Sequence, residues 1–124
     1  MPFVTVTATP TFSAEQKKAL MTRTSSTVVD VLGSKKQSVR VTLHELSEGH
    51  YLCGDSFSTP TVMFEVDLIA GRTEEAKAAL IAQLGKIAHE TTGVPESEVR
   101  ARITDLPNTN VGMENGVTAK MAGR

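Results

Sequence analysis

Residues 38–46 read SVRVTLHEL, and sixty positions later residues 98–106 read EVRARITDL. In both stretches apolar residues alternate with polar ones, a period of two that is typical of a β-strand with one buried face. A valine followed by an arginine opens the alternation in each copy. A strand that recurs at a fixed spacing predicts a duplicated structural unit.

The rest of the chain keeps the same spacing. FSAEQKKAL at residues 12–20 faces RTEEAKAAL at residues 72–80, again without a gap. Because several motifs share one register, we interpret the 124 residues as a single domain built of two repeats, 1–59 and 60–124. The identical pairs at this offset are Glu15/Glu75, Lys17/Lys77, Leu20/Leu80, Gly33/Gly93, Val39/Val99, Arg40/Arg100 and Leu46/Leu106.

Each copy is predicted to fold as strand, helix, strand. The first strand of each copy shows strict alternation, which predicts one buried face. The residues expected on that face are Val4, Val6 and Ala8 in the first copy and Val62, Phe64, Val66 and Leu68 in the second.

Capping signals place the two helices. Ser13 and Thr73 are good N-caps, and Gln16 stands where a capping box needs its partner. Gly33 and Gly93 predict the ends of the helices. The expected apolar stripes are Leu20, Thr24, Val28 and Val31 in the first helix and Leu80, Leu84, Ile87, Ala88 and Thr91 in the second.

Two right-handed β-α-β units predict an α/β (α+β) fold, with a four-stranded mixed sheet and both helices on one face. Residues 46–58 are rich in glycine and polar side chains and predict a turn or short hairpin between the copies. The other sheet face is too polar for a dry core, which favours association of subunits, and we expect a homotrimer. That face would carry Thr5, Thr7, Arg40, Thr42, His44, Glu65, Asp67, Arg100 and Arg102.

The composition excludes several classes of partner. A net charge of −1 and only 4% aromatic residues, with no tryptophan, give no reason to expect nucleic acid or an anionic membrane. No apolar run approaches membrane length, and nothing resembles a signal peptide. The single cysteine, Cys53, fits a reducing cytoplasm, and the three dispersed histidines make no metal pattern, so we expect neither metal nor cofactor.

Pro2 directly follows the initiator methionine. Proline is tolerated at the start of a strand, which is a sufficient structural explanation. Removal of Met1 would instead leave a free secondary amine, and an α-amino group titrates near pKa ~7.7–8.0, closer to neutrality than any lysine. Pro2 is therefore a candidate acid–base catalyst.

The chain resembles the tautomerase superfamily, and most closely the 4-oxalocrotonate tautomerase pattern as two fused copies. The resemblance rests on Pro2, on Gly71-Arg72 before the second helix, and on the runs SVRVTLHELSEGHYLCGD from Ser38 and NTNVGMENG from Asn108. It implies an isomerase that moves a proton within a small unsaturated 2-oxo or 2-hydroxy carboxylic acid. Members form hexamers of short chains or trimers of fused chains.

The resemblance assigns roles residue by residue. It implies Pro2 and Arg72 as catalytic residues and Arg40 and Arg100 as the arginines that bind the substrate carboxylate. Tyr51, in the place of the hairpin aromatic, is implied as a further substrate-binding residue. In the second copy Val62 replaces the proline, so each chain would supply a single amino-terminal catalyst.

Other readings stay open from the sequence. Arg40 and Arg100 fit salt bridges between subunits equally well, Arg72 fits a solvated position, and Tyr51 fits a packing residue. A related Pro2-dependent hydratase, dehalogenase or decarboxylase of unsaturated acids is one alternative. A non-catalytic ferredoxin-like module that binds a small ligand between subunits is another.

Overall fold

The two central strands of the sheet come from different copies of the repeat. In the computed structural model, which describes residues 1–124, β1 (Phe3–Ala8) pairs antiparallel with β3 (Val62–Ile69). The predicted alternation is confirmed, because every second residue of both strands is buried. Ala8 at the end of β1 lies opposite Val62 at the start of β3, so the two copies run in opposite directions.

Each edge strand pairs in parallel with the first strand of its own copy. β2 (Arg40–Glu45) lies beside β1, and β4 (Val99–Leu106) lies beside β3, which gives the order β2-β1-β3-β4. The predicted four-stranded mixed sheet is therefore confirmed. Because the centre is antiparallel, Arg40 and Arg100 begin their strands at opposite ends of the sheet.

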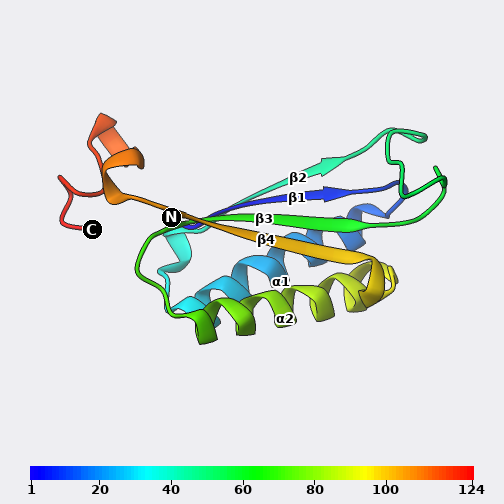
Figure 1. The fold of residues 1–124 in the computed structure, drawn as a ribbon, viewed down its shortest axis with the longest axis horizontal. Helices are drawn as coiled ribbons and strands as arrows, with labels where there is room; N and C mark the ends of the chain where they lie inside the picture. Colours follow the sequence, from blue (N-terminus) through cyan, green and yellow to red (C-terminus); the bar gives the residue numbers. More distant parts are fainter.

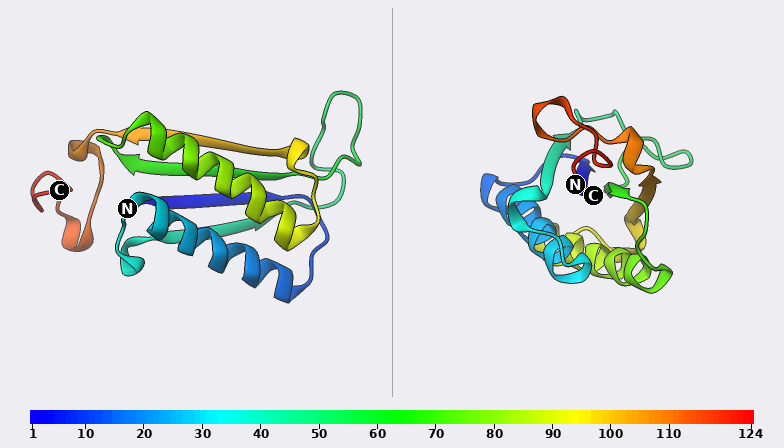
Figure 2. Two further views of the ribbon diagram at one scale, coloured as in Figure 1. Left: turned by 90° about the horizontal axis from the view of Figure 1, so that it is seen from below. Right: turned by 90° about the vertical axis from the view of Figure 1, so that its left-hand side faces the viewer.

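Both helices cover the same face of the sheet, as Figures 1 and 2 show. α1 (Ala14–Leu32) and α2 (Glu74–Thr92) follow the first strand of their copies and pack against each other. Between these helices and the sheet lies one cluster of buried apolar side chains to which both copies contribute. The largest fully buried member is Phe64 of β3.

The helix boundaries follow the predicted signals. Ser13 and Gln16 form a reciprocal capping box at the start of α1, and the Thr73 hydroxyl caps α2. Gly33 and Gly93 end the helices in the left-handed conformation, with φ of 68° and 80°.

The buried stripe of α1 differs by one position from the prediction. Leu32 is buried and Val31 is only half-buried, because the core-facing residues follow the i, i+4 row through Leu20, Thr24 and Val28. In α2 the buried residues are Leu80, Leu84, Ile87 and Ala88, as predicted, while Thr91 is half-buried.

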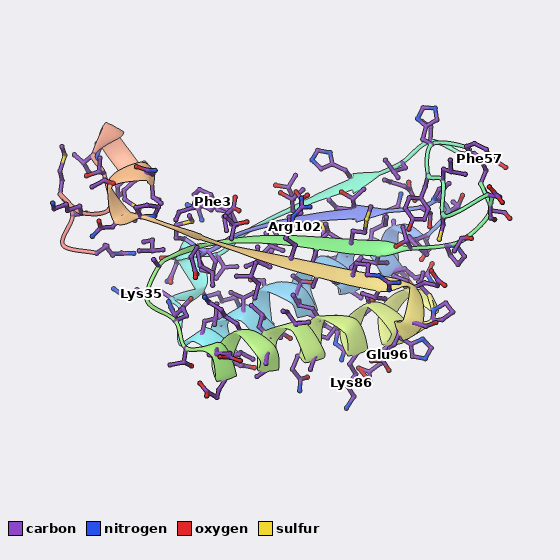
Figure 3. The ribbon with its side chains drawn as sticks, in the orientation of Figure 1. Phe3, Lys35, Phe57, Lys86, Glu96 and Arg102 are labelled. Atoms are coloured by element: carbon purple, nitrogen blue, oxygen red, sulfur yellow. The ribbon has the colours of Figure 1, made fainter.

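The sheet face opposite the helices has no covering layer within the chain. Figure 3 shows Arg102 on this face, where it pairs with the carboxylate of Glu65, its neighbour across β3 and β4. The predicted polar residues of the sheet lie here, half-buried or exposed, between the buried ones. A polar sheet face of this kind is open to water or to another subunit.

The connections gather at the two ends of the sheet (Figure 2). Residues 46–61 form a loop at the end where β2 stops, and an isolated antiparallel bridge between Cys53 and Ser56 confirms a short hairpin inside it. Residues 107–124 form a tail at the opposite end, near the amino terminus. Short 3-10 helices are η1 (Lys36–Ser38), η2 (Glu96–Glu98), η3 (Asn108–Asn110) and η4 (Glu114–Gly116). No helix combines the length and apolar character needed to cross a membrane.

Candidate active site

Pro2 lies in a cavity of about 280 Å³ at the end of the sheet where β1 begins and β3 ends. The antiparallel pairing creates this arrangement, because it places the start of β1 beside the segment that leads from β3 to α2. No acidic side chain lines the cavity. The lining residues are Met1, Pro2, Leu68, Ile69, Ala70, Gly71, Arg72 and Arg124.

The terminal amine is held at the mouth of this cavity. The Met1 ammonium donates a hydrogen bond to the Ser38 carbonyl at 3.0 Å. Partial burial, and then the positive charges of Arg124 and Arg40, hold the pKa of this amine below its usual value, because each disfavours the protonated form. An amine in this position is therefore more readily neutral than an ordinary chain terminus.

The second copy fills the equivalent position with a hydroxyl. The Thr61 Oγ1 donates to the Glu98 carbonyl at 2.8 Å, and Thr61 and Glu98 stand sixty residues after Met1 and Ser38. Val62, the counterpart of Pro2, is completely buried within β3. In the second copy the start of the strand is therefore buried inside the chain and carries no amine.

Arg40 lies directly beside Pro2. Its backbone N–H donates to the Pro2 carbonyl at 3.1 Å, and its guanidinium donates to the Gln37 carbonyl in the preceding 3-10 turn. Its counterpart Arg100 makes the same local contact with the Ser97 carbonyl, at 2.6 Å. Neither arginine forms a salt bridge within the chain, and both are exposed.

Arg72 projects from the loop that precedes α2 and lines the Pro2 cavity. Its guanidinium donates to the carbonyl of Leu32, the last residue of α1. That carbonyl belongs to a helix end, where acceptors lack partners and the dipole is negative. A single contact therefore stabilises the end of α1 and fixes Arg72 at the edge of the cavity.

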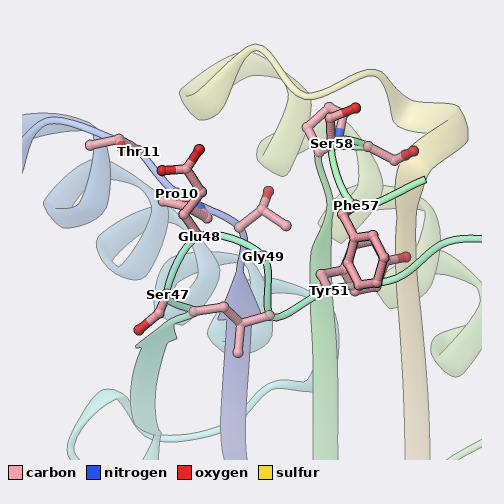
Figure 4. A pocket seen from close by; sticks show the side chains of 12 residues that line it. Pro10, Thr11, Ser47, Glu48, Gly49, Tyr51, Phe57 and Ser58 are labelled. Carbon is pink, nitrogen blue, oxygen red and sulfur yellow. The ribbon is translucent and has the colours of Figure 1, made fainter.

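Tyr51 and Arg100 lie at the other end of the sheet from Pro2. Tyr51 lines a separate cavity of about 520 Å³ with Phe57 and the residues that follow β1 (Figure 4). Arg100 pairs with Met63, which lies opposite Thr7, five residues along β1 from Pro2. At about 3.3 Å per residue that separation is roughly 16 Å. One chain therefore brings together Pro2, Arg40 and Arg72, but not Arg100 and Tyr51.

Arg124 also lines the Pro2 cavity, and no motif in the sequence indicates this position. The tail of residues 107–124 has no hydrophobic periodicity, and Arg124 has no counterpart among the repeated motifs. Its position depends on how the tail folds back towards the amino terminus (Figure 1), and no local signal predicts that path.

The cavity combines a terminal amine whose pKa is lowered with the cations of Arg72 and Arg124, and no acidic side chain lines it. A neutral amine there can accept a proton, and arginines can bind a carboxylate and stabilise an enolate. No group of three or more histidine, cysteine, aspartate or glutamate side chains is placed to hold a metal ion.

The chain thus combines two fused β-α-β copies with an amino-terminal proline in a cavity lined by Arg72 and Arg124. The family model described as tautomerase enzyme matches residues 2–59 and again residues 63–120. The chain belongs to the tautomerase family and is an enzyme of the isomerase type.

Curated relatives match one copy of the repeat at a time. The chain is 40% identical over 60 residues to a 2-hydroxymuconate tautomerase of Pseudomonas putida, which covers 48% of this chain and 94% of the relative. It is 45% identical over 51 residues to a probable tautomerase of Ralstonia nicotianae, covering 41% of this chain and 73% of that protein.

Solved structures match both copies together. The crystal structure of Pt0534 inactivated by 2-oxo-3-pentynoate is 55% identical, with a TM-score of 0.96 over 98% of this chain and 99% of that one. A fused 4-OT described as a symmetric trimer is 34% identical, with a TM-score of 0.94 over the same shares. The 4-oxalocrotonate tautomerase-like fold predicted from the repeat is thereby confirmed.

Proposed function

We propose that this protein moves a proton within a small unsaturated 2-oxo or 2-hydroxy carboxylic acid, with the Pro2 nitrogen as general base and then general acid. The observation that carries the proposal is the position of Pro2, which lines a cavity together with Arg72 and no acidic side chain and accepts a hydrogen bond from the Arg40 N–H. The Met1 amine next to it has a lowered pKa because of partial burial and then the charges of Arg124 and Arg40, and the same surroundings would act on a Pro2 amine. Similarity to 2-hydroxymuconate tautomerases supports a dienol acid as the substrate class.

The mechanism requires that Met1 be removed, because only then is the Pro2 nitrogen an amine. The neutral amine would take the proton of the enol hydroxyl, and the resulting ammonium would return a proton to a carbon of the conjugated system. General acid–base catalysis of this kind contributes roughly 10²–10⁴-fold. Arg72, fixed at the loop–helix junction, would face the oxygen on which enolate charge develops.

We propose a homotrimer as the active assembly. The uncovered polar face of the sheet supports association, and the similarity to fused 4-OT trimers supports that number of subunits. Assembly would also give Arg100 and Tyr51 a role, because each could reach the Pro2 cavity of a neighbouring subunit. A carboxylate would then be held by Arg40 of one chain and by Arg100 and Tyr51 of another.

We further propose that residues 1–124 act as one domain of two repeats, 1–59 and 60–124, and that it works in the cytoplasm. The shared sheet and shared core support the first proposal. The second is supported by Cys53, which is a free, exposed thiol.

The test compares the processed protein with a variant that carries one additional glutamate between Met1 and Pro2. Intact mass establishes first whether Met1 is absent from the wild-type chain. The ketonisation of 2-hydroxymuconate, followed by ultraviolet absorbance, should then be about 10²–10⁴-fold slower in the variant, because its Pro2 nitrogen is an amide. Matching circular dichroism and melting curves would show that both proteins are folded.

Two outcomes would contradict the proposal. Full retention of Met1 in an active wild-type protein would exclude Pro2 as the base. Equal rates for the two proteins would do the same. Turnover of unsaturated halo-acids or hydration of unsaturated acids without ketonisation would instead favour one of the related Pro2-dependent reactions.

A further inference from the structure

Arg124 is held against the Pro2 cavity by the fold of the tail. Val111 and Ala119 are 3% and 0% exposed and anchor residues 107–124. The Arg124 backbone N–H donates to the Ala119 carbonyl at 2.8 Å, and its own carbonyl accepts from the Asn108 Nδ2 at 3.0 Å. Only backbone atoms of Arg124 take part in these contacts, so its position does not depend on its side chain.

The Arg124 guanidinium is free, whereas the two neighbouring arginines are engaged. Arg72 donates to the Leu32 carbonyl, and Arg40 donates to the Gln37 carbonyl. The Arg124 side chain makes neither a hydrogen bond nor a salt bridge in the structure. Its planar set of five donors is therefore available in full, and this geometry matches a carboxylate.

Cationic side chains surround the cavity. Arg72 and Arg124 both line it, Arg40 acts on the terminal amine of Met1, and no acidic side chain lies among the lining residues. An arginine fork binds a carboxylate through two parallel N–H···O bonds. Separate cations at separate points of one cavity therefore suit a ligand with two carboxylates better than a ligand with one.

We propose that Arg124 binds one carboxylate of a dicarboxylate substrate in the Pro2 cavity, so that the tail selects dicarboxylates over monocarboxylates. This inference rests on the proposed function and assigns a specificity residue to the same site. The other carboxylate is bound by Arg40 and by Arg100 of a neighbouring subunit, as in the proposed function. Arg124 then raises affinity without taking part in the proton transfer.

The test uses two unreactive probes with the same six-carbon diene, trans,trans-muconate with two carboxylates and sorbate with one. Binding to the full-length protein is measured by isothermal titration calorimetry for wild type, Arg124→Ala and Arg124→Lys. Lys120→Ala is the matched control, because it removes an exposed cation from the same tail without touching the cavity. A melting curve for each variant shows that the tail contacts, made by backbone atoms, are retained.

We expect Arg124→Ala to weaken muconate binding about ten- to hundredfold, as for loss of a charge-assisted hydrogen bond, with little change for sorbate. Arg124→Lys should recover only part of the muconate affinity, because a lysine lacks the planar fork. Lys120→Ala should bind both probes as wild type does.

Four results would overturn the inference. Wild-type affinity of Arg124→Ala for muconate would remove Arg124 from the site. Equal losses of affinity for muconate and sorbate in Arg124→Ala would show that Arg124 contributes only positive charge. Complete recovery of muconate affinity in Arg124→Lys would show the same. Failure of the wild-type protein to bind either probe would overturn the proposed carboxylate site as well, and is thereby distinguishable from failure of Arg124 alone.

Discussion

Two buried threonines should respond in opposite directions to the same substitution. Thr61 and Thr24 are both 0% exposed, and threonine to valine preserves their shape. The Thr61 hydroxyl donates to the Glu98 carbonyl at 2.8 Å and so joins the start of β3 to the start of β4. The Thr24 hydroxyl in α1 has no hydrogen-bond partner.

The structure sets the expected magnitudes. Thr61→Val removes the hydroxyl donor from the Glu98 carbonyl and should cost about 1–3 kcal/mol of unfolding free energy. Thr24→Val removes a buried, unpaired hydroxyl and should stabilise the fold by about 1 kcal/mol. An unfolding entropy near 2.1 cal/mol/K per residue makes each kcal/mol worth roughly 4 °C for a chain of this length. Tm should therefore fall by about 4–12 °C in the first variant and rise by about 4 °C in the second.

Differential scanning calorimetry of both variants and the wild type at one protein concentration measures these shifts. The concentration must be equal because assembly makes Tm concentration-dependent. The backbone contacts between Thr61 and Thr9 survive in Thr61→Val, so the comparison isolates the hydroxyl. Shifts of the same sign in the two variants would refute the reasoning. Two increases would show that the Glu98 contact contributes nothing, and two decreases would show that the Thr24 hydroxyl is not an unpaired, destabilising group.

The site and the assembly give further predictions. Partial burial first, then the charge of Arg124 and then that of Arg40 lower the pKa of the Met1 amine. Once Met1 is removed the same charges would act on the Pro2 amine, so Arg40→Ala should raise the pKa of that amine and move the low-pH limb of kcat/KM to higher pH. The base must be neutral, so the rate rises with pH through this limb, and a pH–rate profile of the variant beside Lys86→Ala, which removes an exposed cation from α2, measures the shift. An unmoved limb in Arg40→Ala would place its charge away from the amine. Light scattering at working concentration should give three times the chain mass, and a monomer that retains full activity would contradict shared sites.

The fold was predictable because both copies of the repeat carry the same local signals. Each copy has alternating strands, an N-cap residue (Ser13 or Thr73) and a glycine at the end of its helix (Gly33 or Gly93). These signals act within a few residues, so they can be read without knowledge of the tertiary structure. Val31 was assigned to the buried stripe in place of Leu32 because a stripe counted from sequence alone drifts by one position at the end of a long helix.

The composition of the site was only partly predictable. Pro2 and Arg40 are brought together by parallel pairing inside one copy, which the repeat itself implies. The separation of Arg100 from Pro2 follows from the antiparallel contact between the copies, and no residue pattern within a copy reports that contact. Tyr51 is distant because it follows β2, which begins beside Pro2 and ends at the other end of the sheet. Arg124 was missed because the path of an irregular tail is set by tertiary packing.

The central claim is that Pro2 carries a free amine in this cavity, and covalent labelling tests it most directly. 2-Oxo-3-pentynoate is an electrophilic alkynyl ketone that a neutral amine can attack, and it inactivates the similar protein Pt0534. The reagent is applied to Cys53→Ser, which removes the exposed competing thiol, and the adduct is located by peptide mass spectrometry. The account predicts one adduct per chain, on Pro2 of a peptide that lacks Met1, with loss of activity in proportion. An adduct on another residue, or inactivation of a chain that still carries Met1, would contradict it.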